Sequence, residues 1–160
     1  MSSQPVARLL LALAIVAGCQ SGEAERSWPG RWTVVLSPEA PRAMGWTADD
    51  LARYLGAMGL AAERVESTGE VRCRRDRGAV VLSGDGLPGS LLDTTAPTEQ
   101  TFRIDEVRCG SGSLVVLTGG GLLGRQYAAY EWLHALGVRF FHPEEDFVPA
   151  APSWPADMCR

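Results

Sequence analysis

The order of apolar and polar residues along the chain predicts five strands and two helices. Short runs of β-branched and aromatic residues bounded by glycine, proline or serine are typical of strands, and an apolar residue every three to four positions is typical of a helix. Strands are expected at 31–36, 79–82, 101–107, 113–118 and 138–141, and helices at about 48–58 and 122–136. This order favours an α/β fold, an α/β sandwich with a mixed β-sheet and both helices packed on one face.

Three of these elements carry further local signals. Thr47 is placed to cap the first helix, and Trp46 and Leu51 stand at the positions of a hydrophobic staple. The wholly apolar strand at 79–82 is expected in the middle of the sheet, where both its faces are covered. The strands on either side of residues 110–112 (Gly-Ser-Gly) are expected to pair as a hairpin.

The second helix is apolar around most of its circumference when it is projected at 100° per residue, and Gly137 is expected to end it. A sheet covers only one side of a helix, so such a helix needs a second cover. We expect its other face to meet a partner or to remain as an exposed apolar patch. The candidate interface residues are the aromatic and imidazole side chains in this region, Tyr127, Tyr130, Trp132, His134 and Phe141.

The N-terminal segment has the order of a secretory signal, with Arg8, an apolar run at 9–16 and small residues before Cys19. Residues 16–19 (Val-Ala-Gly-Cys) resemble the lipobox of bacterial lipoproteins, which implies cleavage and lipidation of Cys19. We therefore expect an exported, membrane-anchored lipoprotein of the bacterial cell envelope, at the periplasmic or outer surface, with plain secretion as the alternative. The expected parts are a signal peptide at 1–18, a tether at 19–30, a folded domain at 31–149 and a truncated linker at 150–160.

Charge and cysteine content narrow the partners and cofactors. The chain has a net charge of −4 and no lysine, so nucleic acid is not an expected partner. In an oxidising compartment two of the remaining cysteines should pair, and Cys73 with Cys109 is the favoured disulfide because both precede predicted strands. Cys159 is close to the end of the sequence, and its role stays open. A metal site is the competing interpretation, but the cysteines are far apart without a CxxC motif, so we expect no metal and no cofactor.

A glycine motif is the first candidate for chemistry. Gly119, Gly121 and Gly124 fit the spacing of a dinucleotide-binding loop, with Glu144 and Glu145 about 20 residues further on. An exported domain meets no nicotinamide pool, however, and the motif does not open a doubly wound sheet. We favour the simpler interpretation that the glycines allow a tight turn and close packing of the helix.

Acidic and aromatic residues offer two further alternatives. The cluster at 144–146 (Glu-Glu-Asp) could supply acids for glycan hydrolysis, with Glu131 as another candidate, but adjacent residues seldom flank one glycosidic bond, and a solvated linker is favoured. The sequence has two histidines and no G-x-S-x-G motif, so no nucleophilic triad is predicted. The tryptophans could stack on sugars, although Trp32 and Trp132 lie within predicted elements and are expected in the core.

A distinctive pattern runs from Leu114 to Pro149. A strand ends in a Gly-Gly turn, a helix with tyrosines ends in Leu-Gly, and an Arg-aromatic-aromatic strand precedes a proline. These places are taken by residues 118–121, Gly124, Tyr127, Tyr130, Glu131, residues 136–137, residues 139–141 and Pro143. The pattern resembles the small α/β domain that precedes the (β/α)8 barrel in β-N-acetylhexosaminidases, α-glucuronidases and related glycoside hydrolases, the N-domain of glycoside hydrolase family 20. The earlier predicted elements follow the same order from about Arg31.

This resemblance implies a non-catalytic domain, because in those enzymes the catalytic acids come from the barrel, and no catalytic residue is carried over. It also implies a partner for the second helix, a glycoside hydrolase catalytic domain or another carbohydrate-active protein. We therefore expect a membrane-anchored accessory domain in carbohydrate metabolism. The alternatives are a small glycan-hydrolysing enzyme and a polysaccharide-binding module.

Overall fold

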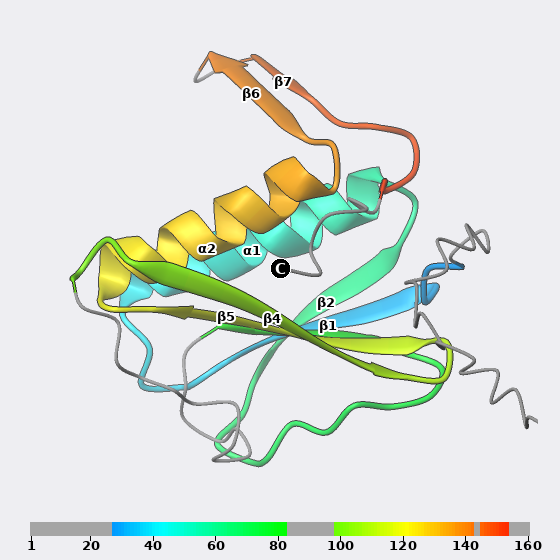
Figure 1. The fold of residues 1–160 in the computed structure, drawn as a ribbon, viewed down its shortest axis with the longest axis horizontal. Coiled ribbons are helices and arrows are strands. Elements are labelled where there is room, and N and C mark those ends of the chain that lie inside the picture. The colour runs from blue at the N-terminus through cyan, green and yellow to red at the C-terminus, as the bar shows by residue number, and fades with distance from the viewer. Residues whose placement is uncertain (1–26, 83–97, 143–144, 154–160) are drawn as a thin grey trace, which may run out of the picture.

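The computed structural model describes residues 27–82, 98–142 and 145–153. In chain order, the elements are β1 Arg31–Leu36, α1 Arg42–Ala57, β2 Ala61–Glu66, β3 Gly78–Leu82, β4 Phe102–Cys109, β5 Gly112–Gly119, α2 Leu122–Ala135, β6 Arg139–His142 and β7 Glu145–Phe147. Five strands form one mixed sheet in the order β2-β1-β3-β5-β4. Both helices lie on one face of this sheet, and the small β6–β7 hairpin lies on the outer side of the helices (Figure 1). The expected α/β class with a mixed sheet is confirmed.

The sheet is parallel except at one edge. β3 lies in its centre and pairs in parallel with β1 and β5, as its wholly apolar sequence predicts. β4 pairs with β5 in antiparallel fashion across the expected glycine turn, where Gly110 has a φ of 67°. Gly110 can adopt this left-handed conformation without the steric cost that a Cβ would add.

The main core fills the space between the sheet and the helices. Trp32 from β1 and Trp132 from α2 are almost completely buried, and their ring centroids lie 5.7 Å apart. Leucine, valine and alanine side chains from every central strand and both helices complete this core. A smaller cluster on the other face of the sheet contains Val35, Val81 and Val116, against which Val71 packs.

The first helix begins earlier than its capping pattern predicts. α1 starts at Arg42, and Thr47 lies in its second turn, where its hydroxyl donates a hydrogen bond to the carbonyl oxygen of Ala43 at 3.0 Å. The predicted cap at Thr47 is therefore wrong. A threonine within a helix can satisfy its hydroxyl on the carbonyl four residues earlier, and this conformation competes with the capping role. Trp46 is 60% exposed and so does not form the predicted staple.

The expected linker character of residues 145–146 is also corrected. Glu145 to Phe147 form β7, which pairs in antiparallel fashion with β6. The expected strand at the end of the domain exists as β6, but it belongs to this separate two-stranded sheet. The chain therefore folds back over the helices after Gly137, whose φ of 103° ends α2 as predicted.

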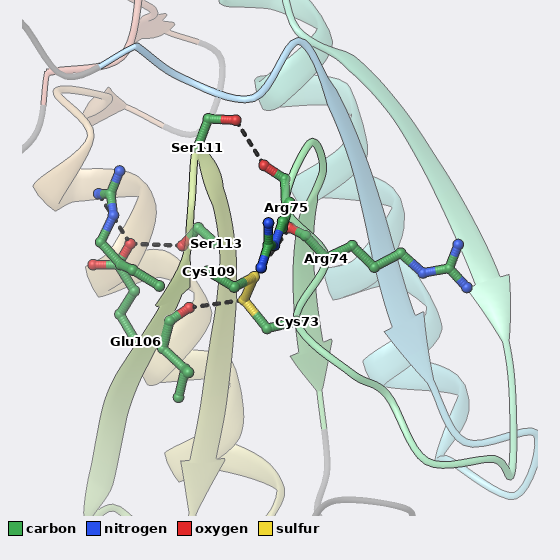
Figure 2. The surroundings of a disulfide bond; sticks show 9 residues. Cys73, Arg74, Arg75, Glu106, Cys109, Ser111 and Ser113 are labelled. Atoms are coloured by element: carbon green, nitrogen blue, oxygen red, sulfur yellow. Dashed lines mark hydrogen bonds and ion pairs between the residues drawn. A yellow bond between two sulfur atoms is a disulfide. The ribbon is translucent and has the colours of Figure 1, made fainter.

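The favoured disulfide is confirmed. Cys73 and Cys109 are joined, with their Cα atoms 6.0 Å apart (Figure 2). The bond links the segment that precedes β3 to the end of β4, on the sheet face that carries no helix.

Candidate functional site

Acidic, basic and aromatic side chains come together where the β6–β7 hairpin meets the two helices. Seven side chains line an open hollow of about 470 Å³, which we call the hairpin hollow. They are Asp50, Arg53 and Tyr54 from α1, Tyr130 from α2, Phe140 and Phe141 from β6, and Asp146 from β7. The hollow combines two carboxylates, one guanidinium and four aromatic rings.

The polar groups of the hairpin hollow bind one another. The Tyr54 hydroxyl donates to Asp146 at 2.5 Å, and the Tyr130 hydroxyl donates to Asp50 at 2.8 Å. Arg53 lies between the two acids, with one Nη atom 3.1 Å from Asp50 and the other 3.6 Å from Asp146. Each carboxylate therefore receives a phenol hydrogen bond and an ion pair with the same guanidinium.

The aromatic rings hold the hairpin to both helices. Phe140 meets Tyr54 and Tyr130 in edge-to-face contacts, with ring centroids 5.6 and 5.7 Å apart. The Arg53 guanidinium lies over the Tyr54 ring, 4.0 Å from its centroid. Edge-to-face pairs and cation–π contacts are favourable arrangements of these groups. Phe140 thus occupies the gap between the tyrosines of the two helices.

The two phenols stay protonated at neutral pH. Burial, together with the hydrogen bond to Asp50, raises the pKa of Tyr130 to about 12. Burial and the hydrogen bond to Asp146 also raise the pKa of Tyr54 above its usual value, although the Arg53 guanidinium opposes this shift. Both tyrosines are therefore hydrogen-bond donors and not bases, and their protons are directed at the acids.

The outward face of α2 continues this surface. At 100° per residue, Leu123, Tyr127, Tyr130 and His134 fall within about 60° of one another, opposite the side that Trp132 buries against the sheet. Leu123 is 43% exposed and Tyr127 is 44% exposed. Phe141, on the adjoining strand β6, is 71% exposed. The projection of the sequence is confirmed in this respect, because the outer face of the helix carries apolar side chains.

The interface candidates from the sequence fall into three groups. Tyr130 and Phe141 line the hairpin hollow, and Tyr127 lies on the outward face of α2. His134 is also exposed, with its Nδ1 atom 3.9 Å from a carboxylate oxygen of Glu131. Trp132 is a core residue with no exposed surface, so a partner cannot contact it on the described surface.

Four residues of the hairpin hollow were not among the sequence candidates: Asp50, Arg53, Tyr54 and Phe140. The Asp50–Arg53 pair at helical spacing reads as an ordinary surface ion pair. Asp146 was a candidate only as one of three consecutive acids, and its contact with Tyr54 spans 92 positions. Cys19, Glu144 and Cys159 lie outside the described residues.

The glycine motif has a structural explanation. The backbone N–H of Gly120 donates to the carbonyl of Thr101, and that of Gly124 donates to the carbonyl of Glu99, both at 2.9 Å. A Cβ on Gly124 would overlap these same carbonyl groups. Two of the amides that a phosphate-binding loop could present to its ligand are thus already satisfied, as expected for glycines that allow close packing.

Metal-binding and membrane-spanning features are described for residues 27–82, 98–142 and 145–153. Within them no three histidine, cysteine or acidic side chains are grouped in a way that could hold a metal ion. Neither helix described there has the length and apolarity that a bilayer crossing requires.

Comparison with known proteins finds no matching family model, no similar curated protein and no similar solved structure.

Proposed function

We propose that this chain is a membrane-anchored, non-catalytic accessory domain that docks on a carbohydrate-active catalytic domain of the glycoside hydrolase type. The docking surface is the outward face of α2 and the exposed side of β6, formed by Leu123, Tyr127, Phe140 and Phe141. We call this surface the α2–β6 face. Anchoring through lipid on Cys19 is part of the proposal.

The observation that carries the proposal is the exposure of large apolar groups on this face. Phe140, Phe141, Leu123 and Tyr127 are between 43% and 71% exposed. The outward face of α2 lies opposite the side that Trp132 buries, and β6 lies on the outer side of the helices (Figure 1). Large exposed apolar patches mark protein interaction surfaces, and aromatic residues are enriched at such interfaces.

The resemblance supports the type of partner. The segment from Leu114 to Pro149 carries the pattern of the domain that precedes a glycoside hydrolase barrel, and that segment supplies α2 and β6. In the resembled family this domain packs on the barrel. The exposed face therefore lies within the part of the chain that the resemblance covers best.

The state of the acids supports a non-catalytic role. Asp50 and Asp146 each accept a tyrosine hydroxyl and pair with Arg53. Catalytic carboxylates in glycosidases instead face the substrate, one as proton donor and one as nucleophile or base. Glu131 lies exposed on a helix surface beside His134. These contacts account for the three acids without a catalytic function.

A polysaccharide-binding module is the second candidate, because the hairpin hollow places exposed Phe140 and Phe141 next to acids and an arginine. Aromatic faces with neighbouring polar groups are suited to small organic ligands such as sugars. In this case the hollow would bind soluble glycan without a partner protein.

The test uses the chain from Gln20 onward, which retains every described element. It is mixed with the glycoside hydrolase encoded downstream of it or beside it, and binding is measured by calorimetry. We expect a complex that Phe141→Asp weakens at least tenfold, because a charge would be placed against the partner's apolar surface. Val65→Asp is the matched control, since Val65 is 37% exposed on β2, away from this face, and should leave the affinity unchanged.

Three results would overturn the proposal. Turnover of aryl glycosides by the isolated chain would make it an enzyme. Retention of the isolated chain on a glycan column, abolished by Phe140→Ala, would favour the binding module. A complex that Phe141→Asp and Val65→Asp weaken equally would move the docking surface elsewhere.

A further inference from the structure

We propose that residues 70–77 form a membrane-facing surface that binds the anionic headgroups of phospholipids. We call this stretch the arginine segment. The inference goes beyond docking on a partner and rests on the proposed membrane anchoring. It assigns an orientation to the domain, because the arginine segment would lie against the bilayer while the α2–β6 face stays free for the partner.

The first support is the separation of charge. The arginine segment holds four arginines and two acids, net +2, within a chain of net charge −4. Arg72 pairs with Glu70 at 2.7 Å, and Arg77 lies 3.8 Å from Asp76. These two pairs leave the other two arginines as the excess positive charge.

Arg74 and Arg75 are the strongest candidates for an external anion. Both are exposed, and within the described parts of the chain neither has a carboxylate within salt-bridge distance. Figure 2 shows the Arg74 side chain extending away from the disulfide. A guanidinium presents a planar fork of N–H donors that matches the oxygens of a phosphate group.

The second support is that the backbone of the arginine segment is fixed in place. Cys73 is bonded to Cys109, and the Ser111 hydroxyl donates to the carbonyl oxygen of Arg75 at 2.6 Å (Figure 2). The carbonyl of Arg74 lies so close to Gly112 that a Cβ there would overlap it. A binding group whose backbone is already ordered loses less entropy when it binds.

The third support is the place where the chain enters the fold. Trp32 of β1 is in register with Gly78, which follows the arginine segment directly, and Gly78 is in register with Ser113. The start of β1, residues 74–77 of the arginine segment and the β4–β5 turn therefore lie at one end of the sheet. Figure 1 shows the blue start of β1 and this turn on the same side of the molecule.

Covalent geometry then limits how far this end can be from the bilayer. Cys19 and Ser27 are eight positions apart. A chain extends at most 3.3–3.6 Å per residue, so a lipid on Cys19 keeps Ser27 within about 29 Å of the headgroups. A domain of this size has a diameter of about 35 Å. The reach of the tether is thus shorter than the diameter of the domain. The end of the sheet where β1 starts, which also carries residues 74–77, therefore lies nearest the anchor.

The test uses the unlipidated chain from Gln20 onward with sedimented vesicles of phosphatidylcholine, with and without 30% phosphatidylglycerol. We expect binding only to the anionic vesicles and its loss at high salt, which screens exposed charges. Each arginine near an anionic surface is worth about a fivefold change in affinity. The double variant Arg74→Gln with Arg75→Gln should therefore bind about 25-fold more weakly.

The matched control is Arg42→Gln with Arg103→Gln, which removes the same net charge at the opposite end of the sheet, at the start of α1 and of β4. It should change binding by less than about twofold. Equal weakening by both pairs would reduce the effect to net charge and overturn the proposal. Binding to a soluble acidic polysaccharide but not to vesicles would also overturn it, in favour of an anionic glycan.

Lipid attachment is measured separately, as the mass of the full chain made in a bacterial host. Lipid on Cys19 with no vesicle binding by the soluble chain would contradict the proposed arginine surface and leave the proposed membrane anchoring unaffected. An unlipidated chain that still binds anionic vesicles would support the arginine surface and contradict the proposed anchor.

Discussion

Breaking the disulfide should lower the stability of the domain by an amount that its loop length sets. Cys73 and Cys109 are 36 positions apart. In the chain-entropy treatment, closing a loop of this length removes about 12.8 cal/mol/K of entropy from the unfolded chain, which is about 3.8 kcal/mol at 25 °C. With a urea dependence of about 2 kcal/mol/M for a domain of this size, the unfolding midpoint should fall by about 2 M.

The assay is urea unfolding of the chain from Gln20 onward, followed by tryptophan fluorescence. All samples carry Cys159→Ser, so that no third thiol can exchange with the disulfide. The oxidised protein is compared with the reduced protein and with the Cys73→Ala and Cys109→Ala double variant. A midpoint shift below 0.5 M in both comparisons would refute the reasoning. It would mean that the disulfide removes little entropy from the unfolded chain.

Two further predictions follow from individual contacts. Tyr130 should ionise near pH 12 in a difference titration at 295 nm against Tyr130→Phe. Because this pKa is raised in the folded state, its contribution to stability is complete below pH 10 and is lost as the pH rises from 10 through 12; a midpoint at 10 would contradict the buried hydrogen bond to Asp50. Gly112→Ala should lower the free energy of unfolding by about 1–3 kcal/mol because its Cβ would overlap the carbonyl of Arg74. Gly56→Ala, with open space around its Cβ in an exposed part of α1, should raise it by about 0.5–1 kcal/mol, and equal effects would contradict the assigned contact.

The sequence predicts the buried strands well and the exposed ones poorly. Residues 79–82 are apolar throughout, and β3 is found in the centre of the sheet as expected. β2 was not predicted, because its sequence Ala-Ala-Glu-Arg-Val-Glu has the composition of a helix and most of its side chains are exposed at the sheet edge. Its pairing with β1 is therefore imposed by the backbone hydrogen bonds and not by an alternating pattern.

The candidate site was only partly predictable for a similar reason. Tyr127 was an interface candidate from the sequence, and its side chain is 44% exposed on α2. The contact of Tyr54 with Asp146 joins two positions 92 residues apart, and no local pattern specifies such a pair. The acids at 144–146 were expected to be solvated because three adjacent charges usually are, and the hairpin that brings one of them to α1 depends on Phe140 packing between two helices.

The sheet order has a consequence for the order in which the chain can fold. β1 lies between β2 and β3, so its second edge stays unpaired until Leu82 is in place, 46 residues after β1 ends. Until then an apolar strand edge is open to pairing with other unfolded chains. β1 is thus the segment that most needs protection while the domain folds, although four of its six residues end up buried.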